Sequence, residues 1–384
     1  MSHAGRSGVT GDPHLVGKMR LVYGVLGYGR GHATRALGIL PRLSQKHDIR
    51  VLAGGSAHDA LAPEWRVDRI PTLSYVYGDR GKISTWRTLC ENAGRIRDLM
   101  LGGPTLDAVI ATMREVRPDV VISDAEPYTH LAARRLGIPR IGFDHFGILA
   151  HCRPPLAGLD RARVLRDVWA YRMLTGNPQR VIISSFYTAP PRRAGVRCIP
   201  TLLRDELFAF RPRRGEHILV YFNSGQRQLT PATYEVLRGL RRTVLIYGTS
   251  FVGADENIVF RPADNRAFLE DLASAAALVS TAGNQLVGEA IYYGKPMLVT
   301  PESTVEQRVN AAAVERLGIG LRARGADLRA DEIDRVLREC PEMAGAARRL
   351  SADGRDQALA ALEADIAELA PVRARAPKML WRTA

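Results

Sequence analysis

A histidine stands directly behind three closely spaced glycines near the start of the chain. In VYGVLGYGRGHATRAL, residues 22–37, Gly27, Gly29 and Gly31 follow an apolar run and His32 comes next. Glycines at this spacing allow a sharp turn from a strand into a helix. We therefore expect His32 in the first helical turn, facing a cleft, where a neutral imidazole can take a proton from a hydroxyl group. The alternative is a histidine that only caps or packs the helix.

The glycines do not complete a dinucleotide-binding motif. The pattern G-x-G-x-x-G needs a third glycine where this chain has His32, and an acidic residue about 20 positions later to hold a ribose. The second apolar run ends in VLAGG and supplies no such acid, and the phosphate-binding pattern G-x-x-x-x-G-K-[ST] is missing as well. A nicotinamide-dependent enzyme is therefore a minor alternative.

Two carboxylates are candidates to orient this histidine. Asp124 ends the apolar run in VVISDAEP, and Glu126 follows two positions later. We favour Asp124, because a side chain at the end of a buried strand points into the cleft at the sheet edge. The alternative is that Asp124 caps the next helix. Arg35 is suited to an anionic acceptor or a phosphate, although a solvent-exposed arginine in the first helical turn is the interpretation we slightly favour.

The segment LVSTAGNQLVGEAIYYGKPMLVTPESTVEQRVNA, residues 278–311, concentrates groups suited to phosphates and sugars. The turn STAGNQ exposes backbone N–H groups at the amino end of a helix, where partial positive charge favours a diphosphate. Glu289, on that helix, can accept hydrogen bonds from the two hydroxyls of a ribose. Glu306 and Gln307 begin the next helix with acceptor and donor groups suited to sugar hydroxyls, and we expect Asn310 to fix that helix locally.

Short apolar runs alternate with helical patterns along the chain. Runs that are apolar throughout and β-branched are typical of strands buried on both faces, which implies parallel sheets covered by helices. The expected strands are 20–26, 49–54, 119–124, 139–144 and 180–186, then 218–223, 243–248, 257–261, 277–281 and 296–301. The fold class is therefore α/β, with two doubly wound, Rossmann-like domains that face a central cleft. The boundaries we expect are 19–209 and 210–370, with 1–18 as a disordered lead-in and 371–384 as a basic tail.

Composition narrows the classes of function. Four widely separated cysteines, without a C-x-x-C pair, favour scattered reduced thiols over a zinc site or a disulfide framework. No apolar run reaches the ~18 residues that span a bilayer, and the first eighteen residues do not read as a secretory signal, so we expect a cytoplasmic protein. The formal net charge of +14 attracts anions, but no nucleic-acid module is visible. The segment 84–103 is either an ordinary amphipathic helix or one that lies on an acidic bilayer at the inner face of the membrane.

The chain resembles the two-domain glycosyltransferases of the GT-B type. The motifs that carry the resemblance are G-x-G-H-x-x-R near the start, ISDxEP, DH after the next strand, and GNxLxxEAIYxGKPMLxxP…EQxxNA late in the chain. They cover about residues 19–320, and the late segment is the most specific part. The resemblance extends to the N-acetylglucosaminyltransferases of peptidoglycan-precursor synthesis, to glycolipid-forming transferases and to UDP-sugar transferases. It is closest to a bacterial and archaeal branch with few characterised members.

The resemblance implies a role for each matching residue. The first domain would bind the acceptor, and the second domain the nucleotide sugar. The acceptor side would hold Gly29, Gly31, Asp144 and His145, for which a purely structural histidine is the alternative. The donor side would hold Thr281, Gly283 and Asn284 at the diphosphate, Glu289 at the ribose, Glu306 and Gln307 at the sugar, Ser224 and Gly225 at the phosphates, and main-chain groups of Phe260 and Arg261 at the base. The loop NSGQRQ is more polar than the family's glycine-rich loop, which is where this chain departs from the pattern.

The expected function is therefore an inverting transfer of a sugar from UDP to an acceptor hydroxyl, with His32 as base and Asp124 behind it. We expect no metal and no cofactor, since the nucleotide sugar is a substrate. The acceptor, whether glycan, lipid or small molecule, is not indicated by the sequence. One alternative is a nucleotide-sugar epimerase of the same fold, although the acids that it needs around the sugar C2 form no clear set. Another is a protein whose basic charge binds membrane or nucleic-acid surfaces.

Overall fold

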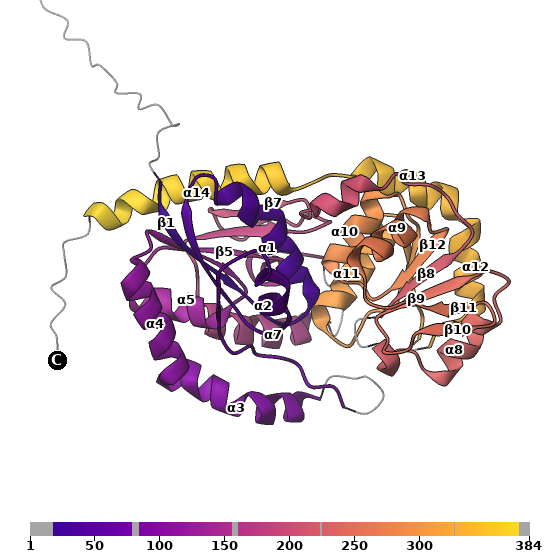
Figure 1. Ribbon diagram of the computed structural model, residues 1–384, viewed down its shortest axis with the longest axis horizontal. Coiled ribbons are helices and arrows are strands. Elements are labelled where there is room, and N and C mark those ends of the chain that lie inside the picture. Colours follow the sequence, from indigo (N-terminus) through magenta and orange to yellow (C-terminus); the bar gives the residue numbers. More distant parts are fainter. Residues whose placement is uncertain (1–17, 79–83, 156–159, 223–224, 326, 376–384) are drawn as a thin grey trace, which may run out of the picture.

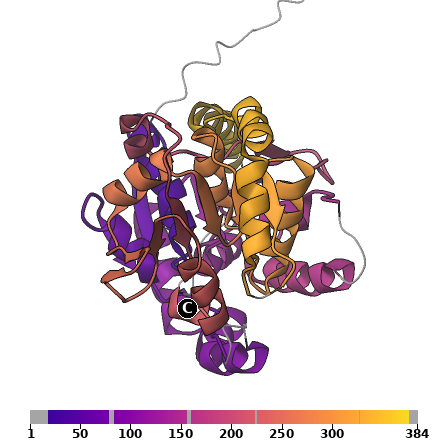
Figure 2. The same ribbon diagram turned by 90° about the vertical axis from the view of Figure 1, so that its right-hand side faces the viewer.

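The computed structural model describes residues 18–78, 84–155, 160–222, 225–325 and 327–375 (Figure 1). Outside these described residues lie 1–17 of the predicted lead-in 1–18, Ser224, and 376–384 of the predicted tail 371–384. Within the described ranges, the chain folds into two parallel-stranded α/β domains placed side by side. Figure 2, viewed from the side of the second domain, shows its orange and yellow elements in front of the indigo and magenta first domain.

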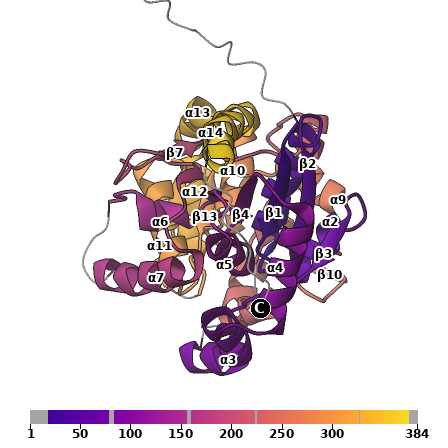
Figure 3. The ribbon, with the colours of Figure 1, turned by 90° about the vertical axis from the view of Figure 1, so that its left-hand side faces the viewer.

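The first domain is built on a seven-stranded sheet with the order β3-β2-β1-β4-β5-β6-β7. Its strands are β1 (Arg20–Val25), β2 (Asp48–Ala53), β3 (Val67–Arg69), β4 (Val120–Asp124), β5 (Arg140–Asp144), β6 (Arg180–Ser184) and β7 (Val196–Ile199). Its helices are α1 (Arg30–Leu43), α2 (Gly55–Leu61), α3 (Thr85–Leu101), α4 (Pro104–Val116), α5 (Pro127–Arg135), α6 (Gly147–His151) and α7 (Asp160–Thr175). They cover both faces of the sheet (Figures 1 and 3).

The second domain repeats this plan with the order β10-β11-β9-β8-β12-β13-β14. Its strands are β8 (Ile218–Tyr221), β9 (Val244–Tyr247), β10 (Gly253–Asp255), β11 (Ile258–Phe260), β12 (Ala277–Ser280), β13 (Met297–Val299) and β14 (Gly320–Arg322). Its helices are α8 (Pro231–Arg238), α9 (Asn265–Ser274), α10 (Asn284–Tyr292), α11 (Val305–Arg316), α12 (Ala330–Arg338) and α13 (Cys340–Leu350). The predicted α/β class with two Rossmann-like domains is confirmed.

The order of the strands places a crevice in each domain. In the first sheet the chain runs outward through β2 and β3 on one side of β1 and through β4 to β7 on the other. The strands β1 and β4 are neighbours, with Val25 opposite Asp124. In the second sheet β8 and β12 are neighbours in the same way. Ligands of such sheets bind at these switch points, beyond the carboxyl ends of the strands.

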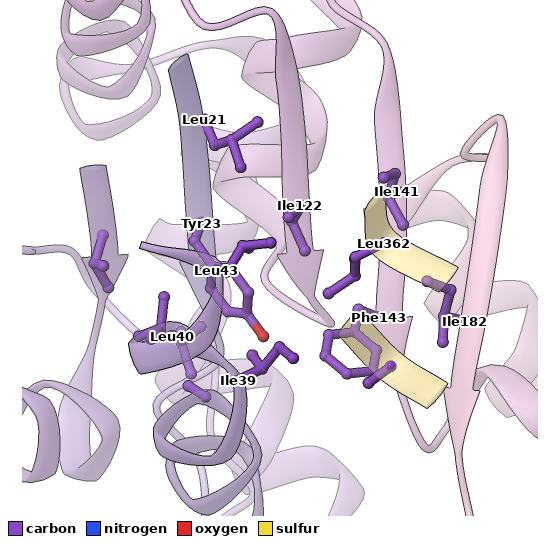
Figure 4. Packing of buried hydrophobic residues seen from close by; sticks show 14 of the residues in the cluster. Leu21, Tyr23, Ile39, Leu40, Leu43, Ile122, Ile141, Phe143, Ile182 and Leu362 are labelled. Atoms are coloured by element: carbon purple, nitrogen blue, oxygen red, sulfur yellow. The ribbon is translucent and has the colours of Figure 1, made fainter. Parts of the chain in front are cut away.

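The last helix, α14 (Arg355–Arg375), returns to the first domain. Ala358, Leu362 and Ile366 join the same buried cluster as the core of the first sheet. Figure 4 shows Leu362 beside Phe143 and Ile182. This packing differs from the expected second domain, 210–370, and helix α14 also runs into the predicted tail. At the other junction, Leu203 and Leu207 already belong to the core of the second domain.

Polar contacts join the two domains at the start of α10. Asn284 begins α10, and its side chain is buried. Its Nδ2 donates to the carbonyl of Ser184 at 3.1 Å, and its Oδ1 accepts from the backbone N–H of Phe186 at 3.2 Å. Helix α10 also packs beside α1. The amino ends of these two helices, one from each domain, therefore face the same space.

Candidate active site

His32 lies in the first turn of α1 and contacts the carboxylate at the end of β4. Its Nδ1 is 2.6 Å from Oδ1 of Asp124, whose side chain is fully buried, and 21% of the histidine side chain is exposed. The turn before it depends on Gly29, which has a φ of +80° that favours glycine. Gly27 approaches the carbonyl of Gly54 so closely that a Cβ would lie 2.1 Å from that oxygen. The sequence thus brings His32 and Asp124 together at the switch point of the first sheet.

Arg35 completes this cluster, and it is not the exposed arginine that we slightly favoured. It is 3% exposed and forms a bidentate ion pair with Asp124. Its Nε donates to Oδ2 and its Nη2 donates to Oδ1, both at 2.7 Å. Residues three apart on a helix share a face, so Arg35 reaches the carboxylate that His32 also contacts. Nη2 lies 3.1 Å from Nδ1 of His32, because both groups point at the same oxygen.

The arginine determines the charge of the buried carboxylate. Burial alone would raise the pKa of Asp124, but the charges of Arg35 and His32 and their hydrogen bonds outweigh this effect and lower that pKa. Asp124 is therefore ionised, and its carboxylate accepts a hydrogen bond from the imidazole of His32. The cap of the following helix is Glu126, which accepts from the backbone N–H groups of Tyr128 at 3.0 Å and Thr129 at 2.6 Å. Burial raises the pKa of Glu126 to about 7.

The amino end of α10 offers an open approach to backbone N–H groups. Gly283 is its N-cap, and a Cβ built there would meet nothing within 4 Å. The first turn of α10 holds no acidic residue, so the positive end of the helix dipole is not neutralised from within the helix. Thr281, just before it, is buried. Beside this turn, the two domains are in contact, since a Cβ on Gly31 in α1 would lie 3.8 Å from Cβ of Gln285.

Gly225 supports the neighbouring loop after β8. It has a φ of +52°, and a Cβ there would lie 2.2 Å from the carbonyl oxygen of Gly248. Only glycine fits this approach, which sets Gly225 against Gly248 at the end of β9. At the far side of this edge, the backbone N–H of Arg261 donates to the carbonyl of Ile246 at 2.9 Å, and its Nε lies 3.4 Å from Asp271.

Glu289 has a partner that the sequence did not indicate. Arg204, in the link between the domains, donates to both carboxylate oxygens, from Nε to Oε1 and from Nη2 to Oε2, each at 2.9 Å. Gln285 donates to Oε1 at 3.2 Å. The carboxylate is 1% exposed. Both carboxylate oxygens of Glu289 are therefore hydrogen-bonded within the protein.

Glu306 and Gln307 differ in how they are placed. Glu306 is partly exposed and lies with Oε1 3.8 Å from Nε2 of His145. Burial raises its pKa to about 7, and the nearby charge of His32 acts in the opposite direction. The amide of Gln307 is occupied by Glu302, accepting from its backbone N–H at 2.9 Å and donating to its carboxylate at 3.1 Å.

Asp144 and His145 are engaged in structural contacts. Asp144 accepts from the hydroxyl of Tyr171 and from the backbone N–H of Gly147, both at 2.6 Å. His145 is buried, with Nδ1 at 3.2 Å from the carbonyl of Ser184 and Nε2 at 3.0 Å from Oδ1 of Asn310. Burial lowers the pKa of His145 to about 4. These contacts favour the structural alternative, in which the two residues shape the cleft. Asn310 also donates to the carbonyl of Ala282 at 2.9 Å, so its contacts join α11 to the turn before α10 and to the first domain, beyond the local role that we expected.

A chain of hydrogen bonds between tyrosine and carboxylate groups runs from the first domain to the second. The hydroxyl of Tyr28, in the glycine turn, lies 2.8 Å from that of Tyr77, which donates to Glu302 of the second domain at 3.2 Å. The guanidinium of Arg227 sits 5.8 Å from the centre of the Tyr77 ring. Nothing in the sequence predicts these contacts, although Tyr28 lies between two of the glycines in the turn.

Comparison with known proteins places this arrangement in a class. A family model described as glycosyl transferase family 1 matches residues 19–341. An uncharacterised glycosyltransferase of Methanosarcina acetivorans is 25% identical over 334 residues, which cover 79% of this chain and 85% of that protein. Phytolacca americana UGT2, solved with UDP-2fluoro-glucose and pterostilbene, has a TM-score of 0.61 and 18% identity over 91% of this chain and 100% of its own. MurG of Acinetobacter baumannii has a TM-score of 0.56 and 16% identity over 90% of this chain and 99% of its own.

The two Rossmann-like domains around a common cleft are those of a GT-B glycosyltransferase. The chain belongs to glycosyl transferase family 1. The resemblance found in the sequence is confirmed, and the protein is a glycosyltransferase.

Proposed function

We propose that this enzyme transfers a sugar from a nucleotide diphosphate, UDP in our expectation, to an acceptor hydroxyl with inversion at the anomeric carbon and with His32 as the base. The observation that supports the proposal most is the contact between His32 and the buried, ionised Asp124. Because Asp124 accepts a hydrogen bond from Nδ1–H, the lone pair of the neutral ring is on Nε2. Among the described residues, the polar contacts of the ring fall on Nδ1, so Nε2 is the nitrogen that receives the acceptor's proton.

The reaction is a single displacement. The acceptor oxygen attacks the anomeric carbon from the face opposite the nucleotide, its proton passes to Nε2 of His32, and the bond from the anomeric carbon to the phosphate oxygen breaks. The imidazolium formed in this step is stabilised by the carboxylate of Asp124. Since the new bond forms on the opposite face, the configuration of the sugar inverts.

We propose that the departing diphosphate lies at the amino end of α10. Gly283 leaves room for a phosphate to reach the backbone N–H groups of Asn284 and the residues after it. The helix dipole and these donors offset the charge that develops on the leaving oxygen. In this proposal they take the place of a divalent cation, and Gly225 holds the second loop near the phosphates.

Binding of the sugar and the ribose rests on α11 and α10. Glu306 is partly exposed beside His145 and would accept from a sugar hydroxyl. Gln307 holds the loop at Glu302 and can also present its amide once the donor is bound. Glu289 accepts from the ribose when Arg204 releases one of its two hydrogen bonds. Contacts between the domains, such as Tyr77 with Glu302, help to exclude water from the closed cleft.

On the acceptor side, we propose that the enzyme works at an acidic lipid surface. Helix α3 exposes 75% of Trp86 and 77% of Leu101, and α7 exposes 65% of Trp169. Both helices pack against α5, and both lie along the lower side of the molecule in Figure 3. Arg87 and Arg97 of α3 are exposed beside these apolar groups. Such a combination binds an anionic membrane interface. None of the described helices is long and apolar enough to span a membrane.

Thermal unfolding with a panel of nucleotide sugars tests the donor first. A bound donor raises the midpoint by mass action, and we expect UDP-sugars to exceed the GDP-, ADP- and dTDP-sugars. The stabilising donor is then incubated with candidate lipid and small-molecule acceptors, and the anomeric configuration of the product is determined by NMR. An inverted product in the presence of EDTA supports the proposal. A retained configuration, or loss of transfer in EDTA, contradicts it, and conversion of the donor to an epimer without any acceptor favours the epimerase.

A further inference from the structure

Two cysteines that lie far apart in the sequence have their sulfur atoms in contact. Cys152 follows α6 and Cys198 lies in β7, 46 positions later, and their Sγ atoms are 3.7 Å apart. Both are free thiols. The sequence favoured scattered thiols because no short spacing joins them. The fold brings them together, since Cys152 forms an antiparallel bridge with Pro191, in the segment that leads into the edge strand β7.

The two thiols differ in their access to solvent. Cys152 is fully buried, in the apolar cluster that also contains Val305 and Val309 of α11. Cys198 is partly exposed and lines a cavity of about 320 Å³ together with Ser185, Thr201 and residues of α10. A small reactant can therefore reach Cys198, whereas Cys152 has no exposed surface.

The contact also changes the chemistry of the exposed partner. The hydrogen-bonding contact with Cys152 lowers the pKa of Cys198 below its ordinary value. A thiolate is the form that reacts with peroxides. Among the residues that the structure describes, no group of three or more His, Cys, Asp or Glu could hold a metal ion, so the pair is not part of such a cluster.

We propose that Cys152 and Cys198 form a reversible intramolecular disulfide when the enzyme meets a peroxide. The Cys198 thiolate attacks one oxygen of hydrogen peroxide, and the O–O bond breaks to give a sulfenic acid and, with one proton, water. The sulfur of Cys152 then attacks the sulfenic sulfur, and its proton leaves with the hydroxyl as a second water. Two thiols are oxidised, one peroxide is reduced to two waters, and a dithiol reductant reverses the change.

The disulfide would join the end of α6 to β7. Helix α6 begins directly after Asp144 and His145, and α11, which carries Glu306 and Gln307, packs on the same cluster. The disulfide would therefore hold α6, and with it the segment that carries Asp144 and His145, against β7. The proposal rests on the contact of the two sulfurs and on the cavity, and it holds whether or not the proposed transfer reaction is correct.

Peptide mapping of the oxidised full-length protein tests the proposal. The reduced protein is treated with hydrogen peroxide, its remaining thiols are alkylated with iodoacetamide, and its peptides are analysed by mass spectrometry. We expect the peptides of Cys152 and Cys198 to be joined and to separate again after reduction. Cys90, exposed on α3, and Cys340, buried in the second domain, serve as internal controls that remain alkylated. Recovery of Cys152 and Cys198 as alkylated thiols at a peroxide dose that oxidises Cys90 would overturn the proposal.

Two variants test the order of the steps. In Cys152→Ser the sulfenic acid at Cys198 persists, so we expect dimedone to label Cys198. In Cys198→Ser we expect no labelling of Cys152, because the peroxide lacks a path to it. Cys90→Ser should form the same internal link as the parent protein. Labelling of Cys152 in Cys198→Ser at the rate seen for Cys198 in Cys152→Ser would contradict the assigned order.

Discussion

Replacing Arg35 with methionine tests the buried cluster behind His32. Arg35 gives Asp124 two hydrogen bonds of 2.7 Å, and both partners are almost completely buried. Removing one member of a buried ion pair leaves an uncompensated charge, which costs about 3–5 kcal/mol. For a folding unit of this size, each kcal/mol shifts the unfolding midpoint by about 2–4 °C. We therefore expect Arg35→Met to unfold at a temperature about 10 °C lower at neutral pH.

The loss should depend on pH in a defined direction. The pKa of Asp124 is lowered in the folded protein, so its contribution to stability is present above its ordinary value of about 4 and is lost as the pH falls through the folded value. Without Arg35, burial raises the pKa of Asp124, and protonation relieves the unpaired charge. The difference in midpoint between the parent and Arg35→Met should therefore shrink as the pH falls from 7.5 to about 5.

A matched control lies on the same helix. Arg42 of α1 pairs with Asp356 of α14, whose side chain is 91% exposed. Exposed ion pairs contribute roughly 0–1 kcal/mol, so Arg42→Met should shift the midpoint only slightly. Differential scanning calorimetry at the two pH values measures both variants. Equal shifts for Arg35→Met and Arg42→Met, or a loss in Arg35→Met that does not change with pH, would refute the argument.

Three further predictions concern the donor and the membrane. Glu289→Gln should raise the KM for the nucleotide sugar by about 10–100-fold with kcat little changed, because it removes a charged acceptor of the ribose; an unchanged KM contradicts that assignment. Burial raises the pKa of Glu306 to about 7. Ionisation of this carboxyl group therefore lowers the stability of the folded protein as the pH rises from about 4.5 through 7. Glu306→Gln should accordingly raise the unfolding midpoint relative to the parent at pH 8 but not at pH 5. Trp86→Ser should weaken co-sedimentation with phosphatidylglycerol vesicles. The control Phe251→Ser alters an exposed apolar residue of the second domain and should leave co-sedimentation unchanged. Equal effects of both changes would contradict membrane docking through α3.

The central strands of both sheets were predictable, and the edge strands were not. Strands such as β4 and β12 are buried on both faces, so their sequences are continuously apolar. The strands β3, β10 and β14 have three residues each and lie at or next to sheet edges, where burial leaves no pattern. β10 also runs antiparallel to β11, which a series of βα units does not indicate. The helical period of α14 was visible, but the sheet it covers depends on contacts with residues far away in the sequence, such as those of Leu362 with Phe143 and Ile182.

The site could be predicted where topology alone brings residues together. His32 follows β1 and Asp124 ends β4, and these strands are neighbours in any sheet of this order. The burial of Arg35 follows from its spacing of three from His32, a signal that was present in the sequence. Arg204 could not be found in this way, because it lies in an irregular link and meets Glu289 only through the packing of one domain against the other.

The most direct measurement compares His32→Ala with His58→Ala. Both histidine side chains are 21% exposed, but His32 contacts the buried Asp124 whereas His58 contacts the exposed Asp59. With the donor identified by thermal shift, we expect His32→Ala to bind it nearly as tightly as the parent and to lower kcat by about 10²–10⁴-fold, while His58→Ala retains the parent's rate. Full turnover in His32→Ala would contradict the role of this histidine as the base.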